Sequence, residues 1–228
     1  MSGLLERLRG GLIVSVQAYA DSVLNTPETI ALLARCAVAN GAVGVRIEGS
    51  ERIAAVRAAV SVPIVGLLKR THDGFEPYIT SRVEEVAEVA RAGADIVAFD
   101  ATQRARAGGA TPRDLIAAAR VHGCLAMADC AALAHIEQAV AGGADIVATT
   151  LAGYTAATRG RALPDLELLA SAALRHPFAV CEGGVAAPEQ AAAAFGAGAS
   201  AVVVGTAITN IDVLVRRFAA VTPGRLVS

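Results

Sequence analysis

The amino-acid sequence predicts a single-domain α/β protein, a (β/α)8 TIM barrel in which eight parallel strands close into a cylinder inside a ring of helices. Short apolar runs alternate with helix-forming stretches eight times along the 228 residues, without a linker or a second core. The segments GADIVAFDAT, GGADIVATT and GASAVVVGT echo one another at intervals of about 50 residues, which indicates one reused strand-and-helix unit. Eight units running in one direction need no reversal of strand order, which favours closure. We therefore expect one domain over residues 1–228.

The elements follow from local signals, taken in chain order. A short amphipathic helix at Ser2–Leu8 would cover the N-terminal mouth of the barrel. Strands are expected in the apolar runs at residues 11–18, 43–49, 62–70, 94–102, 124–130, 144–155, 178–184 and 201–209. Capping residues, first-turn prolines and terminal glycines mark helices at residues 26–40, 50–61, 81–92, 111–122, 131–141, 165–175, 188–195 and 210–220.

Composition disfavours several classes of partner and cofactor. The 20 basic and 21 acidic residues nearly balance and form no basic block, so no nucleic-acid partner is expected. No apolar run approaches the ~18 residues of a membrane helix, and Glu6 lies where a signal peptide would be apolar, so we expect a cytoplasmic protein without a membrane partner. Cysteines and histidines lack metal-binding spacing, and no nucleotide-binding motif occurs, so neither a metal nor a cofactor is expected. The alanine-rich helices are compatible with a homodimer.

Polar or glycine residues stand near the C-terminal ends of all eight expected strands. Active sites of such barrels lie at that end, so these side chains are expected to converge on one pocket. The most telling is Lys69, a charge that ends the apolar run 62–68. It could be the first solvated residue of a loop, but the recurrence of polar ends favours a site. The set is Gln17, Arg46, Lys69, Asp100, Asp129, Thr149 or Thr150, Glu182 and Gly205.

The residue types in this set limit the reactions that the site could catalyse. A lysine at the floor of a pocket, near Arg46, can have its pKa lowered by burial and like charge, which suits it to take or return a proton. Aspartate and glutamate side chains can handle hydroxyl protons or hold the ammonium. Deprotonation next to a carbonyl and a Schiff base on Lys69 both remain open. The backbone at Gly183, Gly184, Gly205 and Thr206 predicts a phosphate site beyond strands seven and eight.

Eight segments, in order from about Gly11 to Ala220, carry a family resemblance: GLIVSVQA, VRIEG, VPIVGLLKR, ADIVAFDAT, LAMADC, TTLAGYT, CEGG and VVVGTAIT. In these the chain resembles the bacterial N-acetylmannosamine-6-phosphate 2-epimerases, isomerases of sialic acid and amino-sugar catabolism. The resemblance implies interconversion of N-acetylmannosamine 6-phosphate and N-acetylglucosamine 6-phosphate by inversion at C2, without metal or nucleotide. It implies Lys69 as the acid/base at C2 and Glu182 as the carboxylate acting on sugar hydroxyls, with the substrate held by Gln17, Arg46, Asp129 and Tyr154.

The chain departs from the family pattern on the phosphate side. The family often has a basic residue where this chain has Gly184, and an arginine where it has Asn210. The anion would then be left to backbone amides, Thr206 and one of Arg70, Arg104 or Arg106, so whether the substrate is phosphorylated stays open. Two other functions also stay open, a Schiff-base lyase or aldolase and a sugar-phosphate-binding protein without catalysis. Neither the role of Asp100 nor closure of the loop at 71–80 follows from the sequence.

Overall fold

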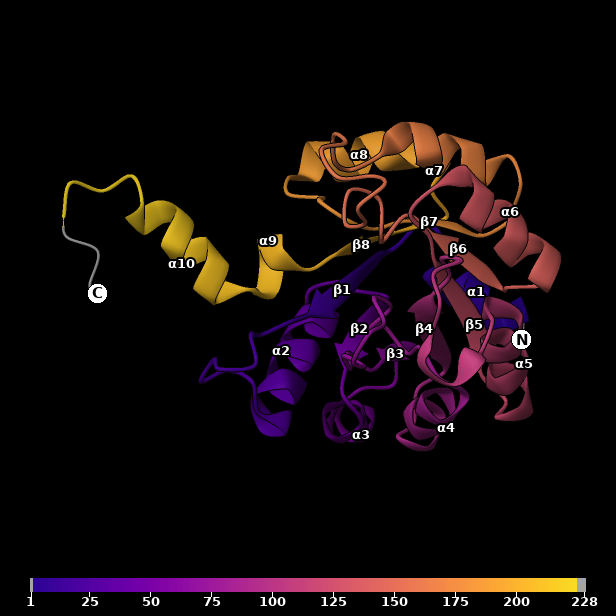
Figure 1. Ribbon diagram of the computed structural model, residues 1–228. Coiled ribbons are helices and arrows are strands. Elements are labelled where there is room, and N and C mark those ends of the chain that lie inside the picture. Colours follow the sequence, from indigo (N-terminus) through magenta and orange to yellow (C-terminus); the bar gives the residue numbers. More distant parts are fainter. Residues whose placement is uncertain (1, 225–228) are drawn as a thin grey trace.

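The computed structural model describes residues 2–224 and closes eight parallel strands into a barrel in sequence order (Figure 1). β8 pairs with β1 in parallel register, Val202 beside Leu12, which completes the cylinder. The predicted (β/α)8 fold is confirmed. The strands are β1 (Leu12–Val16), β2 (Gly44–Glu48), β3 (Ile64–Leu67), β4 (Ile96–Asp100), β5 (Leu125–Asp129), β6 (Ile146–Ala148), β7 (Ala179–Cys181) and β8 (Ala201–Val204).

Helices surround the strands, and some of them begin at side-chain caps. The Thr26 side chain accepts a hydrogen bond from the Thr29 N–H, and Thr111 and Asp114 form a reciprocal capping box. No helix within residues 2–224 is long and apolar enough to cross a membrane. The helices are α1 (Ser2–Leu8), α2 (Pro27–Ala39), α3 (Ser50–Ala59), α4 (Val83–Arg91), η1 (Ala107–Gly109, a 3-10 turn), α5 (Pro112–Val121), α6 (Leu133–Gly142), α7 (Leu166–Ala173), α8 (Pro188–Gly196), α9 (Thr206–Thr209) and α10 (Ile211–Ala219).

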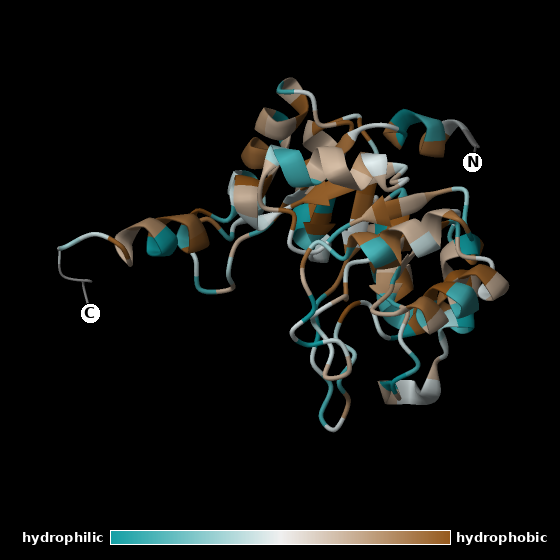
Figure 2. Cartoon of the chain, turned by 90° about the horizontal axis from the view of Figure 1, so that it is seen from above, coloured by the Kyte–Doolittle hydropathy of each residue, from teal (hydrophilic) through white to brown (hydrophobic). Residues whose placement is uncertain are grey.

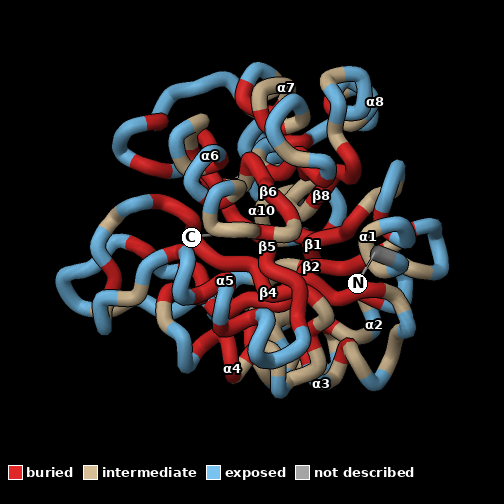
Figure 3. Tube along the Cα trace, turned by 90° about the vertical axis from the view of Figure 1, so that its right-hand side faces the viewer, coloured by how far each residue is buried: buried red, intermediate tan, exposed pale blue. Residues whose placement is uncertain are grey.

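The core has two layers, one inside the barrel and one between the strands and the helices. The strands are largely buried, and the exposed residues lie mainly on the loops and outer helices (Figure 3). Val65 and Leu67 lie in the inner layer and Leu68 in the outer layer, as the alternation of side chains along a strand requires. Leu8 is fully buried in the inner layer. The helix α1 therefore covers the N-terminal mouth as the sequence predicts.

Several strands are shorter than their apolar runs predict. The strand expected at 201–209 ends at Val204, and Thr206–Thr209 forms the helix α9 instead. β3 ends at Leu67, so Lys69 lies two residues beyond the strand. β6 ends at Ala148, although the apolar run suggests a strand to 155. The reason is Thr149, whose hydroxyl donates to the carbonyl of Glu182 (2.9 Å) and accepts from its N–H (3.1 Å). A side chain thus takes over the strand pairing, and the backbone is free to turn.

The last helix differs most from a regular barrel. The segment predicted at 210–220 is helical, but α10 projects away from the cylinder instead of packing against it (Figure 1). Apolar and polar residues alternate along it in the hydropathy colouring (Figure 2). None of its residues is buried.

Candidate active site

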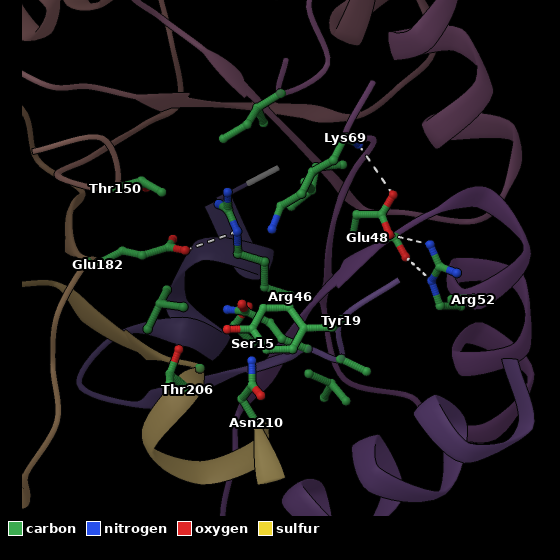
Figure 4. A pocket seen from close by; sticks show the side chains of 18 of the residues that line it. Ser15, Tyr19, Arg46, Glu48, Arg52, Lys69, Thr150, Glu182, Thr206 and Asn210 are labelled. Carbon is green, nitrogen blue, oxygen red and sulfur yellow. Dashed lines mark hydrogen bonds and ion pairs between the residues drawn. The ribbon is translucent and has the colours of Figure 1, made fainter. Parts of the chain in front are cut away.

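A cavity of about 670 Å³ opens at the C-terminal ends of the strands (Figure 4). It is lined by most of the predicted site residues, namely Gln17, Arg46, Lys69, Tyr154, Glu182, Gly183, Gly205 and Thr206. Asp129 is completely buried directly behind Arg46. The structure therefore gathers most of the predicted strand-end residues around one space.

The backbone around Lys69 is fixed by a returning segment, residues 78–80. Lys69 forms an antiparallel bridge with Ile79, and Thr80 donates its N–H to the Leu68 carbonyl (2.9 Å). The Thr80 hydroxyl accepts the Leu68 N–H in return (3.1 Å). Thr80 is buried with a φ of 37°, a left-handed conformation that a β-branched residue rarely adopts. Strain of this kind persists where surrounding contacts enforce it, here directly beside Lys69.

Lys69 is the single lysine of the chain. All other lysine or arginine positions of the chain hold arginine, whose guanidinium stays protonated in proteins. The Lys69 pKa is lowered, because protein atoms desolvate the amine and the Arg46 charge repels its proton. The carboxylates of Glu48, Glu182 and Asp129 act in the opposite direction but do not overcome this. Lys69 is thus better suited to accept a proton than an ordinary solvated lysine.

Arg46 is buried and joins two carboxylates at the cavity floor. Its guanidinium binds Asp129 through two hydrogen bonds (3.2 and 2.6 Å), and its Nε lies 3.1 Å from Glu182 Oε1. Burial alone would lower the Arg46 pKa, but Asp129 and Glu182 outweigh it and raise the pKa. Thr150 donates a further hydrogen bond to Asp129 (2.6 Å). The pair of carboxylates is therefore held rigidly around a permanent positive charge.

Glu182 is buried, and burial raises its pKa to about 7 despite the opposing charge of Arg46. Its Oε2 atom has no hydrogen-bond partner among the described residues. Lys69 and Glu182 extend toward Arg46 from different sides of the cavity (Figure 4). Near neutral pH, Glu182 can therefore gain or lose a proton at an oxygen that no protein group occupies.

The opposite side of the cavity is polar and formed by β1 and the segment after β8. Gln17 donates from its side chain to Ser15 Oγ (3.0 Å) and from its backbone to Thr209 Oγ1 (3.2 Å). A side chain at Gly205 would collide with the Gln17 amide, so glycine is needed for this close approach. Thr206 and Asn210 complete this side. It presents amides and hydroxyls.

Several residues expected to reach an anion lie elsewhere. Gly184 does not line the cavity: its φ is 75°, and the space a side chain would take is filled by Leu163. The other three are arginines outside the lining. Arg70 pairs with Glu88, and Arg104 and Arg106 pair with Asp100.

Asp100 supports the segment 78–80 and does not line the cavity. It lies beside Asp129 in the register of β4 and β5, but its carboxylate binds Thr102 and Arg104 rather than facing the cavity. Its backbone N–H donates to the Ile79 carbonyl (2.9 Å), so it anchors the segment that fixes Lys69.

Glu48 and Arg52 also line the cavity, and the sequence reasoning gave neither a role in the site. They form an ion pair from β2 to α3. Because Glu48 ends a strand and Arg52 lies on the following helix, no spacing rule within one element signals this pair. Residues 2–224 contain no group of three or more histidine, cysteine, aspartate or glutamate side chains placed to hold a metal.

Comparison with known proteins identifies the family. Residues 30–223 match the sequence model of a protein family that is described as "Putative N-acetylmannosamine-6-phosphate epimerase". The chain belongs to this family. Epimerase-family relatives described as "Putative N-acetylmannosamine-6-phosphate 2-epimerase" include one from Thermosynechococcus vestitus (49% identity, 95% of each chain) and one from Synechococcus elongatus (48% identity, 94% of each).

A solved structure of the same epimerase family has the same fold throughout. It is the N-acetylmannosamine-6-phosphate 2-epimerase from Clostridium perfringens, which is 34% identical, with a TM-score of 0.92 over 96% of both chains. The predicted bacterial epimerase family is therefore confirmed.

Proposed function

We propose that this chain interconverts N-acetylmannosamine 6-phosphate and N-acetylglucosamine 6-phosphate, with Lys69 moving the proton at C2. Its epimerase-family membership supports the reaction, which makes the enzyme an isomerase. The observation that supports the mechanism is the low-pKa amine of the only lysine, facing an arginine with two carboxylates.

The chemistry follows from the acidity of the C2 hydrogen. That hydrogen is acidic only when C1 is the carbonyl of the open-chain sugar. Glu182, with a pKa of about 7, is suited to move the hydroxyl proton during ring opening and closure. The Lys69 amine takes the C2 proton, and the electron pair of the C–H bond delocalises onto the C1 oxygen, where Arg46 stabilises the negative charge. Rotation about the C2–C3 bond then presents the opposite face of the planar C2 to the protonated Lys69, and return of a proton to that face gives the epimer.

We place the remaining predicted residues in substrate binding. Gln17 and Tyr154 line the cavity, and Asp129 acts through Arg46. The phosphate would lie against Gly183, Gly205 and Thr206, where backbone N–H groups and a hydroxyl are available. Gly184 would act there through its backbone conformation, since Leu163 occupies its side-chain space.

The test is proton exchange in deuterated water. Proton NMR should show deuterium entering C2 as N-acetylmannosamine 6-phosphate converts to its epimer, and parallel runs with the unphosphorylated sugar measure the contribution of the phosphate. Absence of C2 exchange would refute the proposal and favour a sugar-phosphate-binding protein. Covalent trapping of sugar on Lys69 by borohydride would instead favour a Schiff-base lyase.

A homodimer belongs to the same proposal, and α10 supports it. The outer helices from α2 to α8 pack side by side, yet among the helices and strands within residues 2–224 α10 has substantial contact only with α9. Its Ile211, Val215 and Phe218 recur at helical spacing and are 46%, 59% and 74% exposed. A regular barrel has an eighth outer helix between α8 and α2. Because α10 points away from the barrel, it does not fill that position (Figure 1). We infer that the α10 of a second copy of this chain occupies that position. The α10 of this chain would occupy the same position in the second copy.

We also propose the cytoplasm as the location. Cys124, Cys130 and Cys181 are buried as free thiols. Burial raises the pKa of each, which keeps them unreactive. Free cysteines without disulfides are typical of reducing compartments.

A further inference from the structure

Three carboxylates surround the Lys69 amine closely enough to act on its charge: those of Asp129, Glu182 and Glu48. An ammonium paired with a carboxylate holds its proton more tightly. A catalytic amine must lose that proton before it can take another. The arrangement of the three carboxylates therefore decides whether Lys69 can work as a base.

Two of these carboxylates are already engaged by one arginine. Arg46 binds both oxygens of Asp129 and lies 3.1 Å from Glu182 Oε1. All three side chains are nearly or completely buried. Their negative charge is thereby balanced in part before it acts on Lys69.

The third carboxylate, Glu48, is engaged by a different arginine. The Arg52 guanidinium forms an ion pair with Glu48 Oε2 and donates from Nε to the Glu48 carbonyl (2.7 Å). Gly49 makes room for this fold-back, because its φ is 92° and a side chain there would collide with the guanidinium. The other oxygen, Glu48 Oε1, accepts the backbone N–H of Lys69 (3.3 Å). Figure 4 shows Glu48 between Arg52 and the start of the Lys69 side chain.

Without Arg52, Glu48 would have one backbone hydrogen bond and a free oxygen next to Lys69. The only lysine amine of the chain extends from that same residue into the same cavity. The released carboxylate would then be drawn to the ammonium. The pair would keep Lys69 protonated.

We propose that Arg52 is a positioning residue that holds the Glu48 carboxylate away from the Lys69 amine, so that Lys69 can accept the C2 proton. The inference rests on the proposed function. Arg52 touches no reacting atom and acts through Glu48. Each carboxylate around Lys69 is then matched to an arginine, Arg46 for two of them and Arg52 for the third.

The sign of the effect follows from all charges that face Lys69. They are Arg46 and Glu48 on β2, Arg52 on α3, Asp129 on β5 and Glu182 after β7. The Tyr78 phenol in the returning segment also lines the cavity, and it stays neutral because burial raises its pKa. Removing Arg52 deletes a positive charge and frees a negative one. Both changes raise the pKa of Lys69. The acid limb of the kcat/KM profile must therefore move to higher pH.

The test compares the variants Arg52→Met, Glu48→Gln and the double variant. Arg52→Met should move the acid limb of kcat/KM upward by about one pH unit, roughly a tenfold loss on the acid side with little loss at high pH. The double variant should return the limb to the wild-type position or below, because the carboxylate is gone. Arg57→Met is the matched control, since Arg57 also lies on α3 but pairs with Asp95, and neither residue lines the cavity.

A second readout does not depend on turnover. Lysine labelled with ¹³C at Cε gives a single side-chain signal, because the chain has one lysine, and its pH titration reports the Lys69 pKa directly. A higher pKa in Arg52→Met and reversal in the double variant support the inference. An unchanged titration, or an equal loss of kcat/KM at every pH that the double variant does not reverse, overturns it. Lack of C2 exchange in the wild type would refute the proposed function instead, and the titration would still measure the effect of Arg52.

Discussion

At the scale of single residues, Lys69 differs from every other strongly basic side chain in one property: its amine can lose its proton. The nineteen other basic residues are arginines, whose guanidinium remains charged. The chain thus keeps its positive charges permanent except at the point where a base is needed.

Replacing Lys69 by arginine separates charge from proton transfer. Lys69→Arg keeps a positive charge in the cavity but cannot act as a base, so C2 deuterium exchange should fall by about 10²–10⁴-fold. Lys69→Ala should fall by a similar factor. Exchange is measured by proton NMR, with thermal unfolding as the check that both variants fold. An arginine variant with most of its turnover would remove Lys69 from the mechanism.

Glu182 should make stability depend on pH. Its pKa of about 7 in the folded protein lies above the ordinary value near 4.5, so the folded state holds its proton more tightly. The resulting stabilisation is present below about pH 4.5 and is lost as pH rises through about 7. Glu182→Gln carries no titrating proton, so the free energy of unfolding of the wild type should fall relative to this variant from pH 5 to pH 8. Urea denaturation at both pH values measures the difference, and parallel curves would contradict it.

The same Glu182→Gln substitution should slow turnover. It removes the group that we propose moves hydroxyl protons while keeping the shape of the side chain, so kcat should fall by about 10²-fold or more. Initial rates with N-acetylmannosamine 6-phosphate measure this. A fall in affinity alone, with kcat unchanged, would assign Glu182 to binding.

How far single residues could be predicted depended on where they lie. Arg46, Lys69 and Glu182 could be found because strand ends of a barrel converge. Arg52 could not, because it lies on a helix and reaches the cavity by folding back over Gly49. The side-chain space of Gly184 is filled by Leu163, 21 positions earlier in the chain, a packing relation that no local motif encodes.

At the scale of elements, the returning segment 78–80 positions Lys69 as a strand would. Its contacts replace the missing continuation of β3, and Thr80 provides both a backbone and a side-chain hydrogen bond. The left-handed φ of Thr80 is enforced by these contacts.

Removing the Thr80 hydroxyl should loosen Lys69. Thr80→Ala leaves the buried Leu68 N–H without its acceptor, which should lower the free energy of unfolding by about 1–3 kcal/mol and also lower kcat. Thr80→Ser retains the oxygen and should recover most of both. Denaturant unfolding and initial rates check the pair, and equal behaviour of the two variants would contradict the role of the hydroxyl.

Elements with strong local signals were predictable, and those decided by distant contacts were not. The caps of α2 and α5 are visible as Thr-Pro pairs. The early end of β6 depends on Thr149 bonding to the backbone of Glu182, 33 residues later. An apolar run cannot indicate such an end.

At the scale of the whole molecule, α10 extends from the barrel with an exposed apolar face. If a second copy covers it, the particle in solution should have about twice the 23.0 kDa of one chain. Val215→Asp combined with Phe218→Asp should yield monomers, because two charges would have to be buried in the interface. Light scattering after size-exclusion chromatography measures the mass, with exposed Val121→Asp on α5 as the control. A monomeric wild type would contradict the exchange.

The presence of one lysine has a practical consequence. A reagent that acylates side-chain amines has a single target in the folded protein, and that target sits inside the cavity. Apart from the chain's own α-amino group, each molecule can therefore take up one label. A sugar bound in the cavity would slow the labelling of Lys69. The rate of labelling by an ordinary amine-coupling dye would therefore measure how much of the protein holds a ligand.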